Sequence, residues 1–316
     1  MFIKAFPGTS HPLRILGDIV ATALVDVHVT RHNLYELHVD TDDQLIDQKG
    51  DLFDVAAYSR FKYGQADTGR KYAVALARDF IATYPDAALH EDKIVVSGPS
   101  YKYLSTASHG IVHYFCMVLN AYRVQRGLDP VQQLHSIRST VGSDAYAAGD
   151  AALRATHLAK SQYHVDTEMV RGSLFIFIDD VNVTGATEER TLERTIPCEP
   201  SEIFCLHVAA IDPAYAETNA AIENVMNKAV PLSLDGVCSL IQGDNFRLNT
   251  RVFRSIMEWK DLEELKRFLQ SQKESILLEM YAALVGGTSE MYGRFPAATQ
   301  VFEQVLERRG LSLGVL

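Results

Sequence analysis

The stretch from Ser173 to Glu189 constrains the fold of this chain more than any other. It contains the apolar run Phe175 to Ile178, which is too short for a helix and is typical of a buried parallel strand. Two carboxylates, Asp179 and Asp180, follow directly. Because open α/β sheets bind their ligands at the carboxyl ends of their strands, we expect this pair at a ligand-binding edge.

A turn of small residues, Thr184 to Thr187, comes next and leads into a Glu-rich helix start. The N–H groups of such a turn and the positive end of the helix dipole together suit a phosphate. Carboxylates beside them can accept hydrogen bonds from sugar hydroxyls or approach a bound Mg²⁺. The stretch therefore predicts a site for a sugar phosphate.

Strands that end in two acids also occur in other proteins. P-loop ATPases have them, but this chain has no Gly-x-x-x-x-Gly-Lys-Ser/Thr segment to hold the phosphates of a nucleotide. Receiver domains have their acid pair near the N-terminus, whereas this pair lies beyond the middle of the chain. An ordinary strand end in an α/β core stays the alternative, and the order of strand, turn and helix favours the sugar-phosphate site.

The composition is that of an ordinary soluble globular protein. The 316 residues suit one large domain or one domain with a sizeable appendage. Apolar residues make up 47% of the chain and charged residues 22%. The formal charge of −10 argues against a nucleic-acid or anionic-membrane partner, since both need a basic surface.

The start of the chain and its cysteines indicate the cytoplasm. Residues 1–8 lack the apolar core of a signal peptide, and no span of about 20 apolar residues follows. None of the four cysteines belongs to a Cys-x-x-Cys pair, so neither a zinc site nor a disulfide framework is expected. We therefore expect a cytoplasmic protein with reduced thiols.

Strand and helix patterns succeed one another through the middle of the chain. Short β-favouring runs are expected as strands at 93–97, 133–138, 174–178 and 203–211. Apolar or amphipathic stretches are expected as helices at 71–84, 110–126, 187–195 and 214–229. This order favours an α/β fold, with a mainly parallel twisted sheet and helices on both faces.

The two ends of the chain read differently from the middle. Before residue 60, an apolar stretch at 15–27 could be helix or strand, and residues 35–39 alternate like a strand. Beyond Asn245, residues 251–284 and 297–309 have apolar side chains at helical spacing. We therefore expect an α/β domain with an N-terminal extension at 1–245, its core at about 90–215, and a helical C-terminal cap at 246–316.

The segment from Phe175 to Thr187 resembles the phosphoribosyl-pyrophosphate-binding motif of type I phosphoribosyltransferases: apolar strand, acid pair, apolar residue, Thr-Gly-x-Thr loop. Its Ile-Asp-Asp-Val-x-Val-Thr-Gly-Ala-Thr-Glu form is similar to the ComF-like phosphoribosyltransferases associated with tellurium-resistance and stress operons. The resemblance implies the fold of that family and the use of Mg²⁺. It also implies transfer of a phosphoribosyl group from phosphoribosyl pyrophosphate to a nitrogenous base or base-like acceptor, with release of pyrophosphate.

The resemblance assigns roles within the motif. Asp179 and Asp180 would bind the ribose hydroxyls and lie near Mg²⁺, directly or only through the ligand. The loop would hold the 5-phosphate, through Val183, Thr184, Gly185, Ala186 and Thr187. Two positions depart from the family pattern: Val183 replaces a small or hydroxylated residue, and Asn182 replaces an aliphatic one.

The loop from Ser97 to Thr106 takes the position of the family's pyrophosphate loop. Ser100 can donate a hydrogen bond there, and Lys102 is a compact cation suited to a phosphate oxygen, although a plain surface loop is the alternative. Arg138 ends the second strand, where the family commonly has a basic residue that reaches the pyrophosphate. The interval 139–171 has the length and composition of the family's mobile loop, which would close over the site.

The implied partners are phosphoribosyl pyrophosphate and an unidentified base, with no nucleic acid and no membrane, and a homodimer is a possible state. Two other functions stay open. One is a non-catalytic regulator that binds a phosphoribosyl ligand or nucleotide, and the other is a phosphoribohydrolase. The identity of the acceptor cannot be read, because nothing in the chain resembles a known purine or pyrimidine hood.

Two further patterns carry weaker signals. His109 and His113 share a helix face at a spacing used by metal ligands, but no third ligand is evident, which favours ordinary helix histidines. The polar run 243–251 contains one aromatic residue and could stack on a base, or it is a loop that leads into the C-terminal helices.

Overall fold

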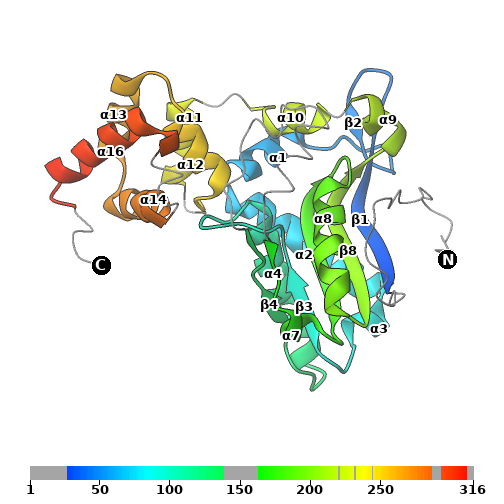
Figure 1. Ribbon diagram of the computed structural model, residues 1–316. Helices are drawn as coiled ribbons and strands as arrows, with labels where there is room; N and C mark the ends of the chain where they lie inside the picture. The colour runs from blue at the N-terminus through cyan, green and yellow to red at the C-terminus, as the bar shows by residue number, and fades with distance from the viewer. Residues whose placement is uncertain are drawn as a thin grey trace, which may run out of the picture.

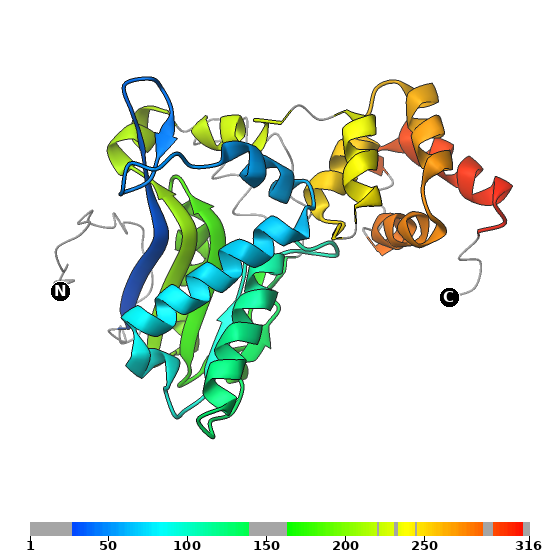
Figure 2. The ribbon, with the colours of Figure 1, turned by 180° about the vertical axis from the view of Figure 1, so that it is seen from behind.

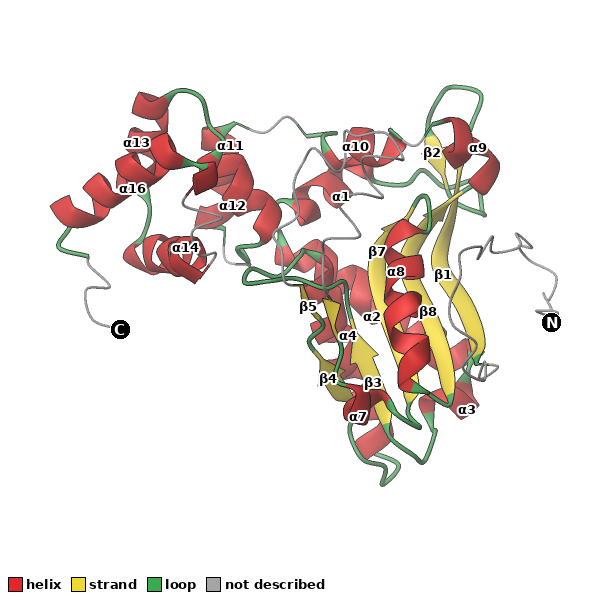
Figure 3. Ribbon diagram, viewed as in Figure 1, coloured by secondary structure: helices red, strands yellow, loops and turns green. Residues whose placement is uncertain are grey.

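The computed structural model describes residues 27–138, 163–219, 221–230, 233–243, 245–286 and 293–311. A twisted six-stranded sheet carries helices on both faces, and a group of C-terminal helices lies beside it (Figures 1 and 3). In sheet order the strands are β2 (Leu45–Ile46), β1 (His28–Val39), β8 (Glu202–Ile211), β7 (Leu174–Asn182), β3 (Ile94–Ser97) and β4 (Gln132–Leu134). Neighbours pair in parallel, except the antiparallel β1 and β2, so the predicted α/β fold is confirmed.

The motif strand β7 lies at the centre of the sheet, and its residues 174–178 are fully buried. On one side it pairs with β8 as far as Asn182, opposite Ala210. On the other side β3 ends at Ser97, opposite Phe177. The end of β7 therefore extends beyond β3 and places the acid pair beside the loop that follows β3.

The face of the sheet seen in Figure 2 is covered by α2 (Ala66–Thr83) and α4 (Ser108–Val124), which lie side by side. Leu76 and Phe80 of α2 are fully buried, as are Ile111 and Phe115 of α4, and they pack into one core with alternate residues of β7 such as Ile176. Their spacing of four residues puts each pair on one side of its helix. The short α3 (Pro85–Ala88) continues from α2.

The opposite face is covered by α8 (Ala186–Thr195), with α7 (Thr167–Val170) and the 3₁₀ turn Ile196–Cys198 nearby (Figure 1). Here Leu192 of α8 packs with Phe175 and Phe177, the β7 residues that alternate with those of the first core. Because successive strand residues point to opposite faces, both sides of β7 are apolar, as the continuous run predicts.

The C-terminal helices enclose a core of their own. They are α11 (Leu234–Gln242), α12 (Thr250–Met257), α13 (Leu262–Ser271), α14 (Glu274–Gly286) and α16 (Pro296–Arg308), called the helical unit below. Leu234, Val237 and Ile241 of α11 belong to the same buried cluster as Phe253 and Phe302. We therefore propose that this unit begins at α11, before the boundary expected at residue 246.

The helical unit joins the α/β domain where α1 (Val55–Lys62) ends and α2 begins. The Arg247 amide donates to the Gly64 carbonyl oxygen at 2.9 Å, and the Asn249 side-chain amide donates to the Lys62 carbonyl oxygen at 3.2 Å. Gly64 has φ +96°, and a Cβ there would lie 2.6 Å from the Arg247 carbonyl oxygen, so only glycine fits. The end of α1 is thus fixed against the helical unit.

Some element boundaries differ from the sequence predictions. The strand expected at 35–39 begins at His28, because nine of its residues find partners on β8. The strand expected at 133–138 divides into β4 and a second strand, β5 (Ile137–Arg138), which pairs with β6 (Tyr163–His164) outside the main sheet. The helix expected at 214–229 is two helices, α9 (Pro213–Thr218) and α10 (Ile222–Asn227).

The apolar stretch 15–27, except its last residue, and residues 139–162 of the expected mobile loop lie outside the described residues. Among the helices of the described ranges, none combines the length and the apolar character needed to cross a membrane.

Candidate active site

The acid pair lies at the end of β7 and is buried: Asp179 is 9% exposed and Asp180 4%. Ser108, the first residue of α4, donates its hydroxyl to the Oδ1 of Asp179 at 2.7 Å and to the Oδ2 of Asp180 at 3.1 Å. Each carboxylate also accepts the backbone N–H of the next residue at 2.8 Å. These bonds hold the two carboxylates in fixed orientations.

Helix α1 supplies two further partners to this pair. The Nζ of Lys62 forms an ion pair with Asp180, and the Tyr58 hydroxyl donates to the Oδ1 of Asp180 at 3.3 Å. Sequence reasoning missed both residues, since α1 falls in the region treated as an N-terminal extension. Their i, i+4 spacing, which puts Tyr58 and Lys62 on one helix face, was the available signal.

The two carboxyl groups differ in their pKa values. Burial and the neighbouring Asp180 charge raise the pKa of Asp179 to about 7. Burial also opposes ionisation of Asp180, but the Lys62 ammonium and several hydrogen bonds outweigh it and lower the pKa of Asp180. Near neutral pH the pair therefore favours a proton on Asp179 and a negative charge on Asp180.

The turn after β7 presents the N-terminus of α8. Gly185 caps this helix at φ +75°, a conformation that glycine adopts without strain, and its N–H donates to the Oδ1 of Asn182 at 2.8 Å. The next three amides, at Ala186, Thr187 and Glu188, have no partner within the helix, as at any helix start. Of the expected phosphate-binding residues, Thr184 and Thr187 are exposed, while Val183 packs partly against the core.

A buried polar cluster fixes the first turn of α8 to the sheet; we call it the Glu188 cluster. Glu188 is 5% exposed and accepts from the Nε of Arg31 on β1 at 2.6 Å. Its other oxygen lies 3.6 Å from the Nε2 of His207 on β8 and 3.4 Å from the Asn182 amide. Burial raises the pKa of Glu188 and lowers the pKa of His207 to about 4, so this histidine is neutral at pH 7. None of these residues except Asn182 had been singled out from the sequence.

The loop after β3 holds the other predicted contacts. Ser100 and Lys102 are half-buried in this loop, and the Nζ of Lys102 lies 5.4 Å from the centre of the Tyr103 ring. The amide of Tyr101 between them donates to the Ser136 carbonyl oxygen at 3.3 Å. Arg138 ends β5, and its side chain lies outside the described part of the structure.

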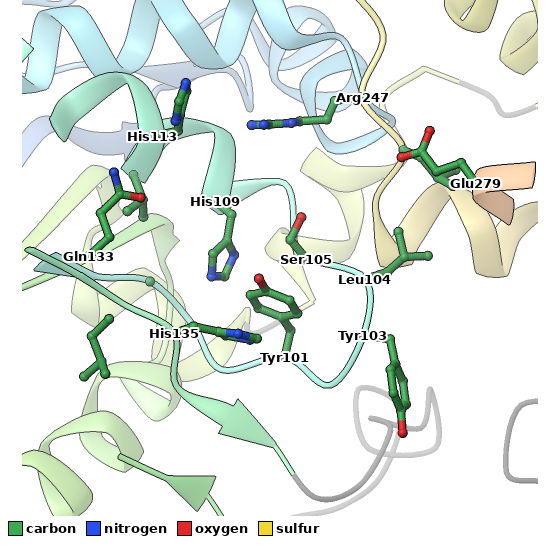
Figure 4. A pocket seen from close by; sticks show the side chains of 14 residues that line it. Tyr101, Tyr103, Leu104, Ser105, His109, His113, Gln133, His135, Arg247 and Glu279 are labelled. Atoms are coloured by element: carbon green, nitrogen blue, oxygen red, sulfur yellow. The ribbon is translucent and has the colours of Figure 1, made fainter. Parts of the chain in front are cut away.

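A pocket of about 400 Å³ opens between this loop, the start of α4, the end of β4 and the helical unit (Figure 4). Tyr101, His109 and His135 meet in it, and Arg247 and Glu279 of the helical unit face the same space. The pocket therefore brings together residues of two weak sequence patterns, the histidine pair of α4 and the run 243–251.

A family model described as PRTase ComF-like matches residues 32–293. The chain belongs to the ComF-like phosphoribosyltransferase family. This match extends well beyond the core expected at residues 90–215, and takes in most of β1, all of α1 and most of the helical unit.

Several solved phosphoribosyltransferases are similar to this ComF-like protein. A hypoxanthine phosphoribosyltransferase from Trypanosoma cruzi, complexed with the product IMP, is 13% identical, with 47% of this chain and 75% of that chain covered and a TM-score of 0.32. A hypoxanthine-guanine phosphoribosyltransferase from Bacillus anthracis is 11% identical over 47% and 80% of the chains, with a TM-score of 0.29. A purine phosphoribosyltransferase from Pyrococcus horikoshii is 13% identical over 47% and 88%, with a TM-score of 0.26. No curated protein matches the chain.

The described residues of this ComF-like protein offer no ready-made cluster of ligands for Mg²⁺. Among the described residues, no group of three or more His, Cys, Asp or Glu side chains is placed to hold a metal ion. The acid pair offers two carboxyl groups, of which the ionised Asp180 is already paired with Lys62, and Asp179 has a pKa raised to about 7. Any Mg²⁺ at this position would depend on oxygen ligands from a bound molecule.

Proposed function

We propose that this protein binds phosphoribosyl pyrophosphate and transfers its phosphoribosyl group to a nitrogenous base or base-like acceptor. The observation that carries the proposal is the buried Asp179–Asp180 pair beside the N-terminus of α8, in a chain of the ComF-like family. A ribose diol needs hydrogen-bond acceptors such as these carboxylates, and a 5-phosphate needs N–H donors such as those of a helix start. Here the two lie next to each other.

The donor would be held by both the N-terminus of α8 and the acid pair. The amides of Ala186, Thr187 and Glu188, with the helix dipole, suit the 5-phosphate. The exposed hydroxyls of Thr184 and Thr187 lie in the same turn. The carboxyl groups of Asp179 and Asp180 suit the ribose hydroxyls, and the Glu188 cluster keeps the start of α8 at a fixed distance from them.

In the proposed reaction a C–N bond forms between the acceptor nitrogen and C1 of the ribose. The C1–O bond to pyrophosphate breaks, pyrophosphate leaves with the electron pair, and the acceptor nitrogen loses its proton. Positive charge develops at C1, as at other glycosidic centres, so the negative Asp180 nearby would favour the transition state. Lys102 and Arg138 are proposed as cations for the departing pyrophosphate.

Mg²⁺ would enter this site as part of the donor. When bound, this ion would supply positive charge that offsets the charge of the leaving group. The acid pair would contact the donor's hydroxyls, and the loop of residues 97–106 would contact its pyrophosphate.

The test is release of pyrophosphate from Mg²⁺·phosphoribosyl pyrophosphate, with and without a panel of purine and pyrimidine bases. Release that needs one of the bases, and that is lost in Asp179→Asn/Asp180→Asn but kept in the matched surface variant Asp42→Asn, supports the transferase. Release without any base would instead identify a phosphoribohydrolase. Release that the double variant leaves unchanged would place the reaction elsewhere.

A non-catalytic regulator is the second candidate, and one observation favours it. The Lys62 ammonium already occupies Asp180, so a ribose diol must share this carboxylate with it or displace it. Binding of the donor without pyrophosphate release, with any base of the panel, would support this function over transfer.

A further inference from the structure

The two carboxyl groups of the acid pair are not equally open to a ligand. The Oδ1 of Asp180 accepts the Tyr58 hydroxyl at 3.3 Å and the Val181 amide at 2.8 Å. Its Oδ2 contacts the Lys62 ammonium and lies 3.1 Å from the Ser108 hydroxyl. Because a carboxylate offers about four lone-pair sites, these four donors surround Asp180 completely. A ribose hydroxyl can therefore reach Asp180 only after one of the donors leaves.

Asp179, by contrast, has an open side. Its Oδ1 accepts from Ser108 at 2.7 Å and from the Asp180 amide at 2.8 Å, whereas no residue of the described ranges bonds to its Oδ2. Asp179 can therefore accept one hydroxyl of a ribose as the structure stands. A diol has a second hydroxyl, and the acceptor next to Asp179 is the fully surrounded Asp180.

Of the four groups around Asp180, the Lys62 ammonium is the one that can leave. The amide is part of the backbone of β7, and the Tyr58 ring and the short Ser108 side chain are buried. Lys62 carries its ammonium on a flexible chain of four carbons. Its backbone is fixed, since its carbonyl oxygen accepts from the Asn249 side-chain amide at 3.2 Å. A change of partner would thus move the Lys62 side chain alone.

Two contacts place the Lys62 ammonium beside the loop after β3, to which the proposed function assigns the pyrophosphate. Ser108, which contacts the same carboxylate oxygen, lies two residues after this loop in the chain. In addition, Asn249 bonds to the Lys62 carbonyl oxygen, and the amide of the adjacent Thr250 donates to the carbonyl oxygen of Ser105 in the loop at 3.0 Å. Since consecutive Cα atoms are about 3.8 Å apart, the start of α12 holds the end of α1 and this loop close together.

We propose that Lys62 exchanges partners when the donor binds: its ammonium moves from Asp180 to the pyrophosphate, and Asp180 then accepts a ribose hydroxyl. The inference rests on the proposed function and adds a donor-binding residue to it. The ammonium keeps an anionic partner, because pyrophosphate carries more negative charge than a carboxylate. Asp180 keeps a hydrogen-bond donor, because the hydroxyl takes the position that the ammonium leaves.

The exchange distinguishes the donor from the product. A nucleoside monophosphate has the ribose and the 5-phosphate but no pyrophosphate, so it offers Lys62 no second anionic partner. The product and the ammonium then compete for the same carboxylate. Once pyrophosphate has left, Lys62 returns to Asp180 and weakens the binding of the product. Lys62 thereby makes the site selective for the pyrophosphorylated ligand and favours product release.

The experiment compares the affinities for phosphoribosyl pyrophosphate and for ribose 5-phosphate, by calorimetry at one Mg²⁺ concentration. The proteins are the full-length wild type, Lys62→Met and the matched control Lys71→Met, at an exposed lysine of α2. In Lys62→Met the affinity for phosphoribosyl pyrophosphate is expected to fall at least about tenfold, the loss expected for a charge-assisted hydrogen bond. Its affinity for ribose 5-phosphate is expected to rise, because Asp180 is then open to a hydroxyl. The control should keep both affinities.

The ratio of the two affinities decides the outcome. A ratio that stays at its wild-type value in Lys62→Met, whether both affinities fall together or neither changes, would show that Lys62 only neutralises the acid pair, and would overturn the exchange while leaving the proposed function standing. Absence of phosphoribosyl pyrophosphate binding to the folded wild type would instead remove the proposed function.

A second measurement uses the wild type and does not depend on the folding of Lys62→Met. Proton–nitrogen correlation spectra of the lysine ammonium groups report the partner of Lys62, whose signal is assigned by its absence in Lys62→Arg. Phosphoribosyl pyrophosphate is expected to shift this signal much further than ribose 5-phosphate does. Equal shifts with the two ligands, or no shift when phosphoribosyl pyrophosphate is bound, would overturn the exchange.

Discussion

Two buried carboxylate clusters lie at the end of β7, and they differ in how the buried negative charge is balanced. In the Glu188 cluster one carboxylate meets one guanidinium, from Arg31, with a neutral histidine and an amide around it. In the acid pair two carboxyl groups share one cation, Lys62. The first cluster is balanced, whereas the second has one carboxylate more than it can neutralise.

This difference separates a structural role from a functional one. The balanced Glu188 cluster has no need of a further ligand and keeps α8 on the sheet. The acid pair retains a proton on Asp179 up to about pH 7 because a second negative charge there is unfavourable. Hydroxyl donors or a cation from a substrate would relieve that excess, as the proposed donor does.

The largest effect is expected for the cation of the acid pair. Lys62→Met would leave Asp180 buried and unpaired, so the free energy of unfolding at pH 8 should fall by about 3 kcal/mol. Urea denaturation of this variant and of Lys71→Met, at an exposed lysine of α2, measures the difference. Loss of less than about 1 kcal/mol would mean that Lys62 does not neutralise the pair in solution.

A smaller loss is expected in the balanced cluster. Arg31→Met removes the partner of Glu188, but the Arg31 side chain is 41% exposed and His207 stays nearby, so about 1–2 kcal/mol is expected from the same urea measurement. Because α8 would lose its anchor, affinity for the donor should fall as well, although Arg31 lies outside the proposed contacts. Equal losses of unfolding free energy in Arg31→Met and Lys62→Met would show that the two clusters do not differ in charge balance.

The raised pKa of Asp179 predicts that removing this carboxyl increases the stability of the protein. A carboxyl whose pKa is higher in the folded protein binds more protons there, so it withdraws stability as the pH rises from about 4 to about 7. Asp179→Asn removes this effect and should make the protein more stable than the wild type at pH 8, by about 1 kcal/mol. Melting curves from pH 4 to pH 8 check it, and a constant difference across that range would show that Asp179 titrates normally.

The smallest effect is expected at the residue that links the two clusters. Asn182→Leu removes the acceptor of the Gly185 N–H and one contact of Glu188, which should cost less than about 1 kcal/mol and weaken donor binding severalfold. Asn224→Leu, at an exposed position of α10, is the matched control. Unchanged donor affinity in Asn182→Leu would show that the turn does not depend on this bond.

The parts of the site that were predictable from the sequence are those encoded by neighbouring residues. β7, the position of Asp179 and Asp180 at its end, and the helix after Gly185 follow from one continuous pattern. The partners of these residues could not be predicted, because Lys62 lies 118 residues from Asp180 and Arg31 lies 157 residues from Glu188. Arg247 and Glu279 join the pocket only through docking of a second hydrophobic core, which periodicity does not reveal.

The assignment of α11 and the length of β1 were likewise not predictable from neighbouring residues alone. α11 carries the apolar spacing of an ordinary surface helix, and only its packing against α13 assigns it to the helical unit. Likewise β1 is longer than its alternating pattern suggests, because β8 supplies hydrogen-bond partners to polar residues such as Asn33.

The measurement that tests the central claim most directly is a calorimetric titration of Mg²⁺ and phosphoribosyl pyrophosphate into the wild type and Asp179→Asn/Asp180→Asn. We expect micromolar binding to the wild type, abolished in the folded double variant because its amides cannot replace the charged Asp180 beside Lys62. Absence of binding to the folded wild type, or equal binding to both proteins, would contradict the assignment of the acid pair as the donor site.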